Sequence, residues 1–405
     1  ANKKIITVTA MVAFVFFLPI TGNAQEVYVT LPVISMNEAV NLSKENYPLL
    51  KQKQLEINKQ EQLKSTVYDF GTTQIFTGGE EINNGNGIYT TVGIGQSNIN
   101  VFGISAKKRL QEQHIQLAQK AFQLSELDLE LEVKKAWANV FQSKRKYNLY
   151  KELDSIYTNF EKAVALNYKV EAISRLEYSA AKNQALQVQN KFMQSKSEYD
   201  IALQQLNLWL VSDTFYTVTN DFEITNKINV ASFNPEKHPL FEIAKLKVTE
   251  AEAKYKTAKA DNLPKLNLQG GFQNLNGNSG FYTYQAGISI PFLSGTSRAK
   301  VKTAKINTEI AETNILFKKQ EVQSKFTQSK ENYQKWKTSW VFYKNKVLPL
   351  VKEQKVGALF AYKEGEIDYT AFTQLIKEAI QSELEAQEAL INYLESTFQL
   401  QYFNQ

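Results

Sequence analysis

The chain has 405 residues, of which 43% are hydrophobic, and a formal net charge of +6. It contains no Cys, which excludes disulfides, metal–thiolate sites and a thiol nucleophile. The net charge is small for this length and the charges are interspersed, so the composition gives no indication of a nucleic-acid partner.

The N-terminal segment has the pattern of a signal peptide. Two lysines form a basic start, an apolar stretch runs from Ile5 to Ile20, and small residues lead to a cleavage position after Ala24. The apolar stretch is short for a membrane span, so we expect a signal peptide over residues 1–24 and not the alternative, an N-terminal anchor. The mature chain, 25–405, contains no second apolar run long enough for a membrane helix, and a place in a membrane would therefore require a β-barrel.

The mature chain contains an internal repeat. Three matches share nearly the same offset, of 191, 192 and 194 residues: Asn46-Tyr47-Pro48-Leu49-Leu50 with Lys237-His238-Pro239-Leu240-Phe241, Gly103 with Gly295, and Tyr168-Lys169 with Tyr362-Lys363. This predicts two halves of the same element order, 36–210 and 237–402, joined by a small mixed segment, 211–236, at mid-height on the helices. We expect each half to form a helix, a β-hairpin, a very long helix, a turn and a long helix.

The predicted long helices exceed what an ordinary globular domain buries. Ala106 to Tyr168 has no Pro or Gly and is rich in strong helix formers, and Arg298 to Val356 is alike, with an interruption at Pro349. A helix of this length spans about 90–100 Å, so it must lie in a coiled coil or helical array. Two adjacent apolar stripes suit a last helix packed between two neighbours in a ring, although a bundle with a wide core face is an alternative. The stripes are Ile376, Ile380, Leu384, Ile391 and Leu394, and Leu375, Ala379, Ala386, Leu390 and Tyr393.

Four segments alternate between apolar and polar residues, which predicts strands with one apolar face. In the second half they are Lys265 to Gln273 and Tyr282 to Ile290, joined by a polar loop, 276–280. In the first half they are Val67 to Thr77 and Ile88 to Val101, with a change of parity that a bulge near Gly95 would explain. Aromatic residues lie near the strand ends, where membrane-interface girdles are expected: Tyr68, Phe70, Tyr89, Phe281, Tyr282 and Phe292.

Four strands do not close a barrel, because about eight is the lower limit for transmembrane barrels. The chain must therefore oligomerise, and two copies would supply eight strands while three would supply twelve. The strand pattern does not choose between these numbers. A soluble β-sandwich is disfavoured, since only four candidate strands occur among the helices.

Three short motifs have counterparts in a known family. Leu263-Pro264-Lys265-Leu266-Asn267-Leu268 is similar to the opening of the third strand in TolC-like outer-membrane factors, and Ile288-Ser289-Ile290-Pro291-Phe292-Leu293-Ser294-Gly295 is similar to their strand-to-helix exit. Gly93-Ile94-Gly95-Gln96-Ser97 resembles the matching place in the first half, especially in members that work with heavy-metal efflux pumps. The resemblance covers nearly the whole mature chain.

The resemblance implies a mainly α fold with a β-barrel part. Three chains would form a homotrimer in the outer membrane, with a 12-stranded transmembrane barrel, four strands per chain, and an α-helical barrel extending into the periplasm. It implies a passive efflux conduit for metal ions or drugs, in contact with outer-membrane lipid, a periplasmic adaptor (membrane fusion protein) and an inner-membrane pump of the RND or another type. The main alternative is a periplasmic coiled-coil adaptor or scaffold without a barrel.

The repeat places two helix-to-helix turns at 168–174 and 362–368, and the resemblance implies that they form the periplasmic tip. In the family such turns carry a Val-Gly-like step that adaptors grip. Gly365 fits this step, whereas the first turn has Glu171 where Gly is usual and would permit φ > 0. The expected adaptor-docking residues are Tyr168, Lys169, Val170, Ile173, Ser174, Tyr362, Lys363 and Gly365.

The acids in these turns are Glu171, Glu364, Glu366 and Asp368. In a trimer each would repeat as a ring, and carboxylate rings favour cations, so we consider them a candidate gate. Ala371 and Gln374 stand about where the resemblance leads us to expect acids, so Glu366 and Asp368 are substitutes by proximity. The alternative is that the acids are solvated turn residues or caps, with Asp368 and Ser174 as N-caps.

We find no catalytic or cofactor-binding constellation. The His residues, His114 and His238, are far apart in the chain, and no Gly-rich phosphate loop occurs. With three Met residues in all, a Met- or His-based metal relay is unsupported. We therefore expect neither enzyme activity nor a cofactor or metal site. A third class of protein that we consider is a secreted hydrolase. It would need a nucleophile or paired carboxylates in a compact fold, and the rod-like helices leave no room for one.

Overall fold

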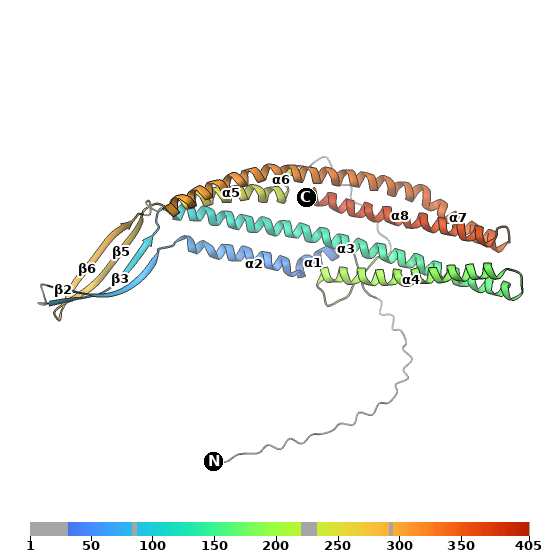
Figure 1. The fold of residues 1–405 in the computed structure, drawn as a ribbon, viewed down its shortest axis with the longest axis horizontal. Helices are drawn as coiled ribbons and strands as arrows, with labels where there is room; N and C mark the ends of the chain where they lie inside the picture. The colour runs from blue at the N-terminus through green and yellow to red at the C-terminus, as the bar shows by residue number, and fades with distance from the viewer. Residues whose placement is uncertain (1–30, 83–86, 220–232, 291–294, 405) are drawn as a thin grey trace, which may run out of the picture.

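A computed structural model describes residues 31–82, 87–219, 233–290 and 295–404. The expected signal peptide, residues 220–232 of the connecting segment and Phe292 lie outside these ranges. The molecule is elongated, with a four-stranded sheet at one end and two helical hairpins at the other (Figure 1).

The elements follow the repeated order expected from the sequence. The first half contains β1 (Val33–Ile34), α1 (Met36–Asn46), α2 (Pro48–Gln62), the 3-10 helix η1 (Leu63–Val67), β2 (Thr72–Ile82), β3 (Gly87–Ile99), α3 (Ile104–Lys169) and α4 (Arg175–Leu210). After β4 (Thr217–Val218), the second half contains η3 (Pro235–Lys237), α5 (Pro239–Ala260), β5 (Lys265–Leu275), β6 (Asn278–Ser289), α6 (Gly295–Phe342), the π-helical segment η4 (Tyr343–Val347), α7 (Leu348–Lys363) and α8 (Tyr369–Phe403). The repeated motif begins equivalent helices, since Pro48 and Pro239 occupy the first turns of α2 and α5, where a missing N–H costs nothing.

The long helices agree with the prediction. α3 spans 66 residues, which corresponds to about 99 Å at the usual rise. Pro349 does not end the second long helix. In a regular α-helix its ring would clash with the carbonyl of Asn345, four residues earlier. The π-helical segment η4 directly precedes Pro349, and its wider turn accommodates the ring. None of the helices in the described part of the chain combines the length and the apolar composition needed to cross a lipid bilayer.

The four long strands form one antiparallel sheet in the order β2-β3-β5-β6. One face is apolar and exposed in the single chain, and its side chains are Ile75, Ile88, Val92, Ile94, Leu268, Phe272, Tyr282, Tyr284 and Ile288. The opposite face is mainly polar: Gln273 donates to the Thr91 hydroxyl (3.2 Å), and Asn267 donates to the Ser289 hydroxyl (2.7 Å). Because β2 and β6 each pair on one side only, both edges of the sheet are unpaired among the residues that the structure describes.

The expected start of the first strand, at Val67, is wrong. Residues 63–67 form η1, Val67 is buried, and β2 begins at Thr72. The chain first has to turn from the helices into the sheet, and it does so at Gly71 (φ +79°), whose N–H donates to the Asp69 carboxylate (2.9 Å). Beside the start of β2, at the same end of the sheet, β3 stops at Ile99, short of the expected Val101.

Two further details of the strands differ from the expectation in position. The bulge expected near Gly95 lies just beyond it, where the pairing of β3 with β5 shifts between Gln96 and Ile99 and Asn98 adopts φ +60°. The expected loop 276–280 is a tighter turn, because Asn276 and Gly277 both adopt positive φ and β6 begins at Asn278.

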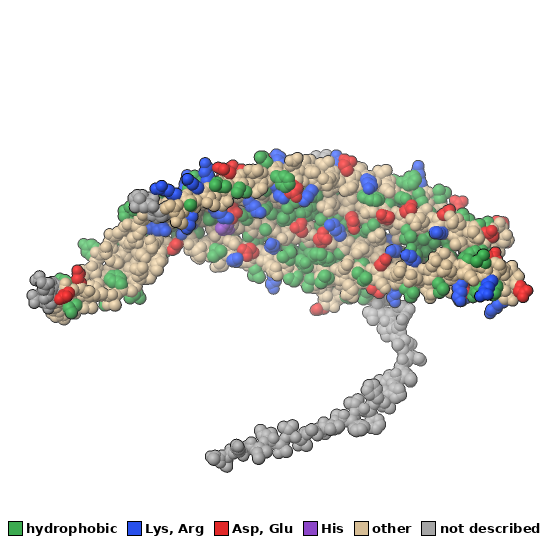
Figure 2. Space-filling view, in the orientation of Figure 1, with side chains coloured by type: hydrophobic (Ala, Val, Ile, Leu, Met, Phe, Trp, Pro, Cys, Tyr) green, Lys and Arg blue, Asp and Glu red, His purple; other side chains and the backbone are tan. Residues whose placement is uncertain are grey.

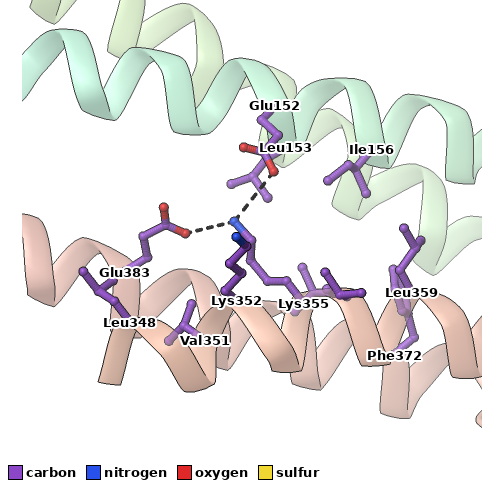
Figure 3. Close-up of a pocket in the computed structure, with 12 residues that line it drawn as sticks. Glu152, Leu153, Ile156, Leu348, Val351, Lys352, Lys355, Leu359, Phe372 and Glu383 are labelled. Atoms are coloured by element: carbon purple, nitrogen blue, oxygen red, sulfur yellow. Dashed lines mark hydrogen bonds and ion pairs between the residues drawn. The ribbon is translucent and has the colours of Figure 1, made fainter. Parts of the chain in front are cut away.

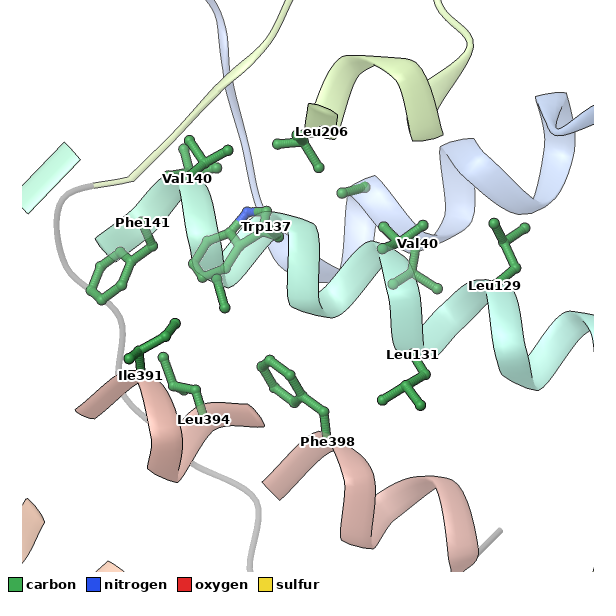
Figure 4. Close-up of a cluster of buried hydrophobic side chains, with 14 of the residues drawn as sticks. Val40, Leu129, Leu131, Trp137, Val140, Phe141, Leu206, Ile391, Leu394 and Phe398 are labelled. Carbon is green, nitrogen blue, oxygen red and sulfur yellow. The ribbon is translucent and has the colours of Figure 1, made fainter. Parts of the chain in front are cut away.

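The main core lies at mid-height, where α1, α4 and α8 pack around α3 (Figure 4). Its centre is the fully buried Trp137, whose indole N–H donates to the Ile34 carbonyl (3.1 Å) and which stacks on Phe141. Both expected stripes of α8 contribute buried residues, including Leu394 and Leu390, and α8 contacts α3, α6 and α7. The helix therefore packs between neighbours, as the double stripe predicts.

Part of the connecting segment docks on this core. β4 pairs in parallel with β1 beside Trp137. Asn207 receives the Tyr216 N–H (2.8 Å) and donates to the Tyr216 carbonyl (2.9 Å), which holds the segment against α4. Lys144 donates to the Val218 carbonyl (2.6 Å). These bonds place the described part of the segment at mid-height.

Candidate functional site at the helical tips

The end of the molecule opposite the sheet is formed by two helical hairpins, α3–α4 and α7–α8 (Figure 1). The turns that join them contain all the expected docking and gate residues. Lys169 and Lys363 end α3 and α7, where a positive charge is favoured by the helix dipole.

The first turn closes α3 with a pair of characteristic hydrogen bonds. The Ala172 N–H donates to the Asn167 carbonyl (2.9 Å), and the Glu171 N–H donates to the Tyr168 carbonyl (3.0 Å). This is the Schellman arrangement, which requires a left-handed residue just past the helix end. Glu171 occupies that position with φ +57°.

The second turn has the same hydrogen bonds 194 residues later. The Glu366 N–H donates to the Ala361 carbonyl (2.8 Å), and the Gly365 N–H donates to the Tyr362 carbonyl (3.1 Å). Gly365 takes the left-handed position with φ +75°. The departure from Gly at Glu171 therefore does not change the shape of the first turn, because the same backbone geometry is held by the same two bonds.

The caps proposed for the following helices are present. Ser174 accepts from the Glu177 N–H (3.1 Å) while the Glu177 carboxylate accepts from the Ser174 N–H (2.8 Å), which is a complete capping box. Asp368 accepts from the Ala371 N–H (2.8 Å) and caps α8. A capping role explains why Asp and Ser stand at these positions, and it leaves the second carboxylate oxygen of Asp368 available to solvent or a ligand.

Most of the expected tip residues are exposed, and two are half-buried. The exposed ones are Tyr168, Lys169, Val170, Ser174, Lys363, Gly365 and the four acids Glu171, Glu364, Glu366 and Asp368. Tyr168 also stacks on Tyr178 across the first hairpin (5.1 Å between ring centroids). Ile173 and Tyr362 are half-buried, because they pack against the core of the tips.

An aromatic cluster joins the two hairpins just behind the turns. Phe160 of α3 lies 5.0 Å from Tyr362, 5.3 Å from Tyr369 and 5.2 Å from Phe372, between ring centroids. Burial, followed by the neighbouring Tyr369, raises the pKa of the Tyr362 hydroxyl above its usual value. Tyr362, one of the expected docking residues, therefore belongs to the packing between the two hairpins as well as to the second turn.

A cavity of about 430 Å³ opens between α3 and the α7–α8 hairpin, one step further from the turns (Figure 3). Its walls are mainly apolar and include Leu153, Val351 and Phe372. Lys355 extends across it from α7, with its ammonium nitrogen 3.0 Å from Glu383 of α8 and 3.7 Å from Glu152 of α3. This ion bridge is the polar link between the hairpins in the region that Figure 3 shows.

Sequence reasoning missed this bridge and the aromatic cluster. The aromatic residues Tyr362, Tyr369 and Phe372 stand close together in the sequence around the second turn, which is a signal for a local cluster. No comparable signal marks Lys355, because its two partners are distant in sequence and each lies among other acids.

Comparisons with known proteins bear on the fold. No protein-family model matches the chain, and no curated protein matches it. Several solved structures do. One is a membrane protein from Pseudomonas aeruginosa, with a TM-score of 0.79 and 14% identity over 92% of this chain and 91% of that chain. Another is CusC, whose structures are described for conformational changes in folding and transmembrane channel formation, with a TM-score of 0.76 and 14% identity over 91% of this chain and 92% of that chain. A third is the CmeC outer membrane channel of Campylobacter jejuni, with a TM-score of 0.72 and 14% identity over 91% of this chain and 85% of that chain.

The chain has the fold of the TolC-like outer-membrane channels. The matches extend over nine-tenths of the chain, so the TolC-like fold includes the sheet, the long helices and the tips together. The resemblance found in the sequence is thus confirmed for the fold.

On the TolC-like fold the two His residues lie far from the tips. His114 of α3 lies 3.1 Å from Glu250 of α5, and His238 is buried at the start of α5. Within the ranges that the structure describes, no three His, Asp or Glu side chains are grouped so that they could hold a metal ion.

Proposed function

We propose that the chain is one protomer of a homotrimeric outer-membrane efflux channel. It acts as a passive conduit for solute export, and the energy comes from an inner-membrane pump of the RND or another type through a periplasmic adaptor. The observation that carries the proposal is the sheet, which has an exposed apolar face and two unpaired edges and stands at the end of helices of TolC-like fold.

The apolar face favours a lipid environment for the sheet. Tyr284 (90% exposed), Ile75 (84%) and Phe272 (68%) remain mostly exposed, and the contact of Phe272 with Tyr282 (5.6 Å between ring centroids) lies within the exposed face itself and does not cover it. Nine such residues on one face exceed what a soluble monomer ordinarily exposes. The opposite polar face would then line an aqueous interior, as in outer-membrane barrels.

The two edges favour an oligomer. Unpaired backbone groups of β2 and β6 cannot be left in lipid, where no water satisfies them. Pairing β6 of one copy with β2 of the next would remove every edge, and three copies of four strands make the 12-stranded barrel that the resemblance implies. The alternative, a periplasmic adaptor or scaffold without a barrel, gives the apolar face no role.

We further propose that the tips dock the adaptor and gate the channel. Exposed residues at both turns, among them Val170, Lys363 and Gly365, would contact the adaptor. The acids Glu171, Glu364, Glu366 and Asp368 would form rings in the trimer that favour cations. The proposed cargo is metal ions or drugs, and metal ions are included because of the resemblance at Gly93-Ile94-Gly95-Gln96-Ser97.

Single-particle imaging of the protein purified from outer membrane in mild detergent tests the proposal. We expect a threefold hollow rod with a short barrel and a detergent belt at one end. A solid helical rod, or a monomer without a belt, would contradict the channel and favour the adaptor or scaffold.

A further inference from the structure

Two stretches of the sequence lack acids entirely. No Asp or Glu occurs between Glu81 and Glu112, or between Asp261 and Glu309. Each stretch contains a cluster of bases at the same place in the repeat: Lys107, Lys108 and Arg109 in the first, and Arg298, Lys300, Lys302 and Lys305 in the second.

Both clusters lie where a long helix leaves the sheet. α3 begins at Ile104 and α6 at Gly295, so Lys108 and Lys302 are within about 10 Å of the helix starts at the usual rise. The two starts lie at the same end of the sheet, and Figure 2 shows Lys and Arg side chains gathered at this junction.

Local energetics do not explain bases at these positions. The N-terminal end of a helix carries a partial positive charge, which favours acids, and neither α3 nor α6 has an acid in its first turn. Lys107 pairs with Asp69 (3.3 Å) and Lys305 approaches Glu309 (3.9 Å). The remaining five are exposed and form no ion pair within the described ranges: Lys108, Arg109, Arg298, Lys300 and Lys302, which we call the basic collar.

Exposed apolar side chains lie beside the basic collar. Phe70 (61% exposed) precedes β2, Phe102 (58%) follows β3, and Ile290 (46%) follows β6, all at the helix end of the sheet. Apolar and aromatic anchors next to a row of Lys and Arg are the pattern of a protein surface at the boundary between lipid and water.

The other end of the sheet has the opposite charge. Its strands carry Glu80 and Glu81 near the far turn, and no Lys or Arg other than Lys265, which lies at the helix end. The positive charge is thus confined to the helix end of the sheet, and the far end carries none.

We propose that the basic collar binds the phosphate groups of anionic phospholipids in the membrane leaflet on the helix side. The inference rests on the proposed function, since it requires the sheet to lie in a bilayer. The five side chains would hold the channel at a defined depth, because their charges stay at the level of the head groups while the apolar face lies in the hydrocarbon.

Electron paramagnetic resonance of spin-labelled lipids tests this inference. The assembled full-length protein is reconstituted in phosphatidylcholine vesicles with a trace of labelled phosphatidylglycerol or labelled phosphatidylcholine, and the motionally restricted fraction is measured. We expect the phosphatidylglycerol label to associate about two- to threefold more strongly, and this preference to fall with added salt. It should disappear in the variant K108Q/R109Q/R298Q/K300Q/K302Q.

A matched variant controls for net charge. K151Q/K162Q/K182Q/K191Q/K196Q removes five exposed lysines of α3 and α4 far from the sheet, and it should keep the wild-type preference. Equal restricted fractions for the two labels in wild type, or a preference that survives loss of the basic collar, would overturn the inference while leaving the channel intact. If neither labelled lipid shows a motionally restricted fraction, the protein does not lie in the bilayer, and the proposed function would be overturned as well.

Discussion

Gly365 is the residue at the tips whose backbone leaves least choice of side chain. Its φ is +75°, although a Cβ placed there would meet no atom within 4 Å, so the constraint is conformational and not steric crowding. Glu171 shows that the fold can hold a non-glycine residue in the equivalent position (φ +57°). The left-handed conformation costs a non-glycine residue about 1–2 kcal/mol.

Replacing Gly365 by Val should therefore weaken the second turn by about 1–2 kcal/mol, and more than Ala would because Val is β-branched. We expect export to be impaired while the trimer remains intact, measured by efflux assays and by size-exclusion chromatography. The change Glu171→Gly places the favoured residue in the same geometry and should raise the temperature of unfolding. Unchanged export in Gly365→Val would remove this turn from the docking site.

His238 links the start of α5 to the end of α8. Its Nδ1 accepts from the Leu240 N–H (3.3 Å), and its Nε2 lies 3.3 Å from the Tyr402 carbonyl, so the neutral ring with hydrogen on Nε2 satisfies both partners. The side chain is buried, and burial lowers its pKa from 6.5, against the opposing effects of the Tyr402 carbonyl, Asp128 and Glu242.

Stability should consequently decline in acid. Below about pH 6.5 the unfolded chain binds a proton at this residue that the folded chain does not, so the free energy of unfolding falls as the pH is lowered. We expect a lower thermal midpoint at about pH 5 than at about pH 7.5. His238→Gln keeps one donor and one acceptor, and it should show a smaller decline; an equal decline would place the acid sensitivity elsewhere.

At the scale of elements, the two hairpins are joined by an aromatic cluster and by the Lys355 bridge. The side chains of Lys355 and Glu383 are 19% and 26% exposed, so their pair is only partly screened by water. Glu152 lies on the other hairpin and is 58% exposed, which makes its contribution smaller.

Lys355→Met should cost about 1 kcal/mol, mostly through the lost pair with Glu383 of α8, and the weaker pair with the more exposed Glu152 should loosen α7 from α3 by only part of this. We expect faster amide hydrogen exchange in α7 and in α3 near Glu152, with no change at mid-height around Trp137. Lys352→Met is the matched control, since Lys352 lies on the same helix and is exposed. Equal exchange in the two variants would show that the apolar and aromatic packing joins the hairpins without help from the ion bridge.

At the scale of the whole molecule, the unpaired edges make a prediction about the assembly. Ile75 of β2 and Tyr284 of β6 lie on the same face of the sheet, at opposite edges. Because the chain has no Cys, introduced cysteines are the only thiols.

Ile75→Cys combined with Cys at one of Tyr282, Tyr284 or Ala286 should cross-link chains into species up to a trimer on oxidation, detected on denaturing gels. Each single variant should remain largely monomeric in the gel. Ile75→Cys with Gln285→Cys places the thiols on opposite faces and should cross-link poorly. A ladder that ends at dimer would contradict three copies and favour an eight-stranded closure.

The proposed acid ring can be separated from helix capping. Asn caps helices as well as Asp does, so Asp368→Asn should keep the bond to the Ala371 N–H while removing the charge. We expect Glu366→Gln with Asp368→Asn to lower the preference for cations in planar-bilayer recordings, without loss of thermal stability. Unaltered ion selectivity would reduce these residues to turn and cap roles.

Much of this architecture follows from local pattern. The long helices lack Pro and Gly and repeat apolar residues with helical spacing, so α3 is predicted to within two residues at its start and one at its end. The paired turns and their caps follow from the repeat, because Ser174 and Asp368 stand directly before helical runs. The expected start of β2 is wrong because Tyr68-Asp69-Phe70 alternates like a strand just after Val67, whereas Val67 is buried and ends the 3-10 helix η1.

The sequence by itself determined the order of helices and strands, the helical or alternating spacing of apolar residues in each of them, and which residues form the two helix-to-helix turns. These features depend on neighbours within a few positions. Only the tertiary structure decided that Lys355 bridges the two hairpins, that Phe160 joins the aromatic cluster, and that β1 pairs with β4 beside Trp137. These contacts join residues distant in sequence, and the chain contains many other acids, aromatics and apolar pairs of the same chemistry. Their choice is made by the packing of whole helices, which no local pattern records.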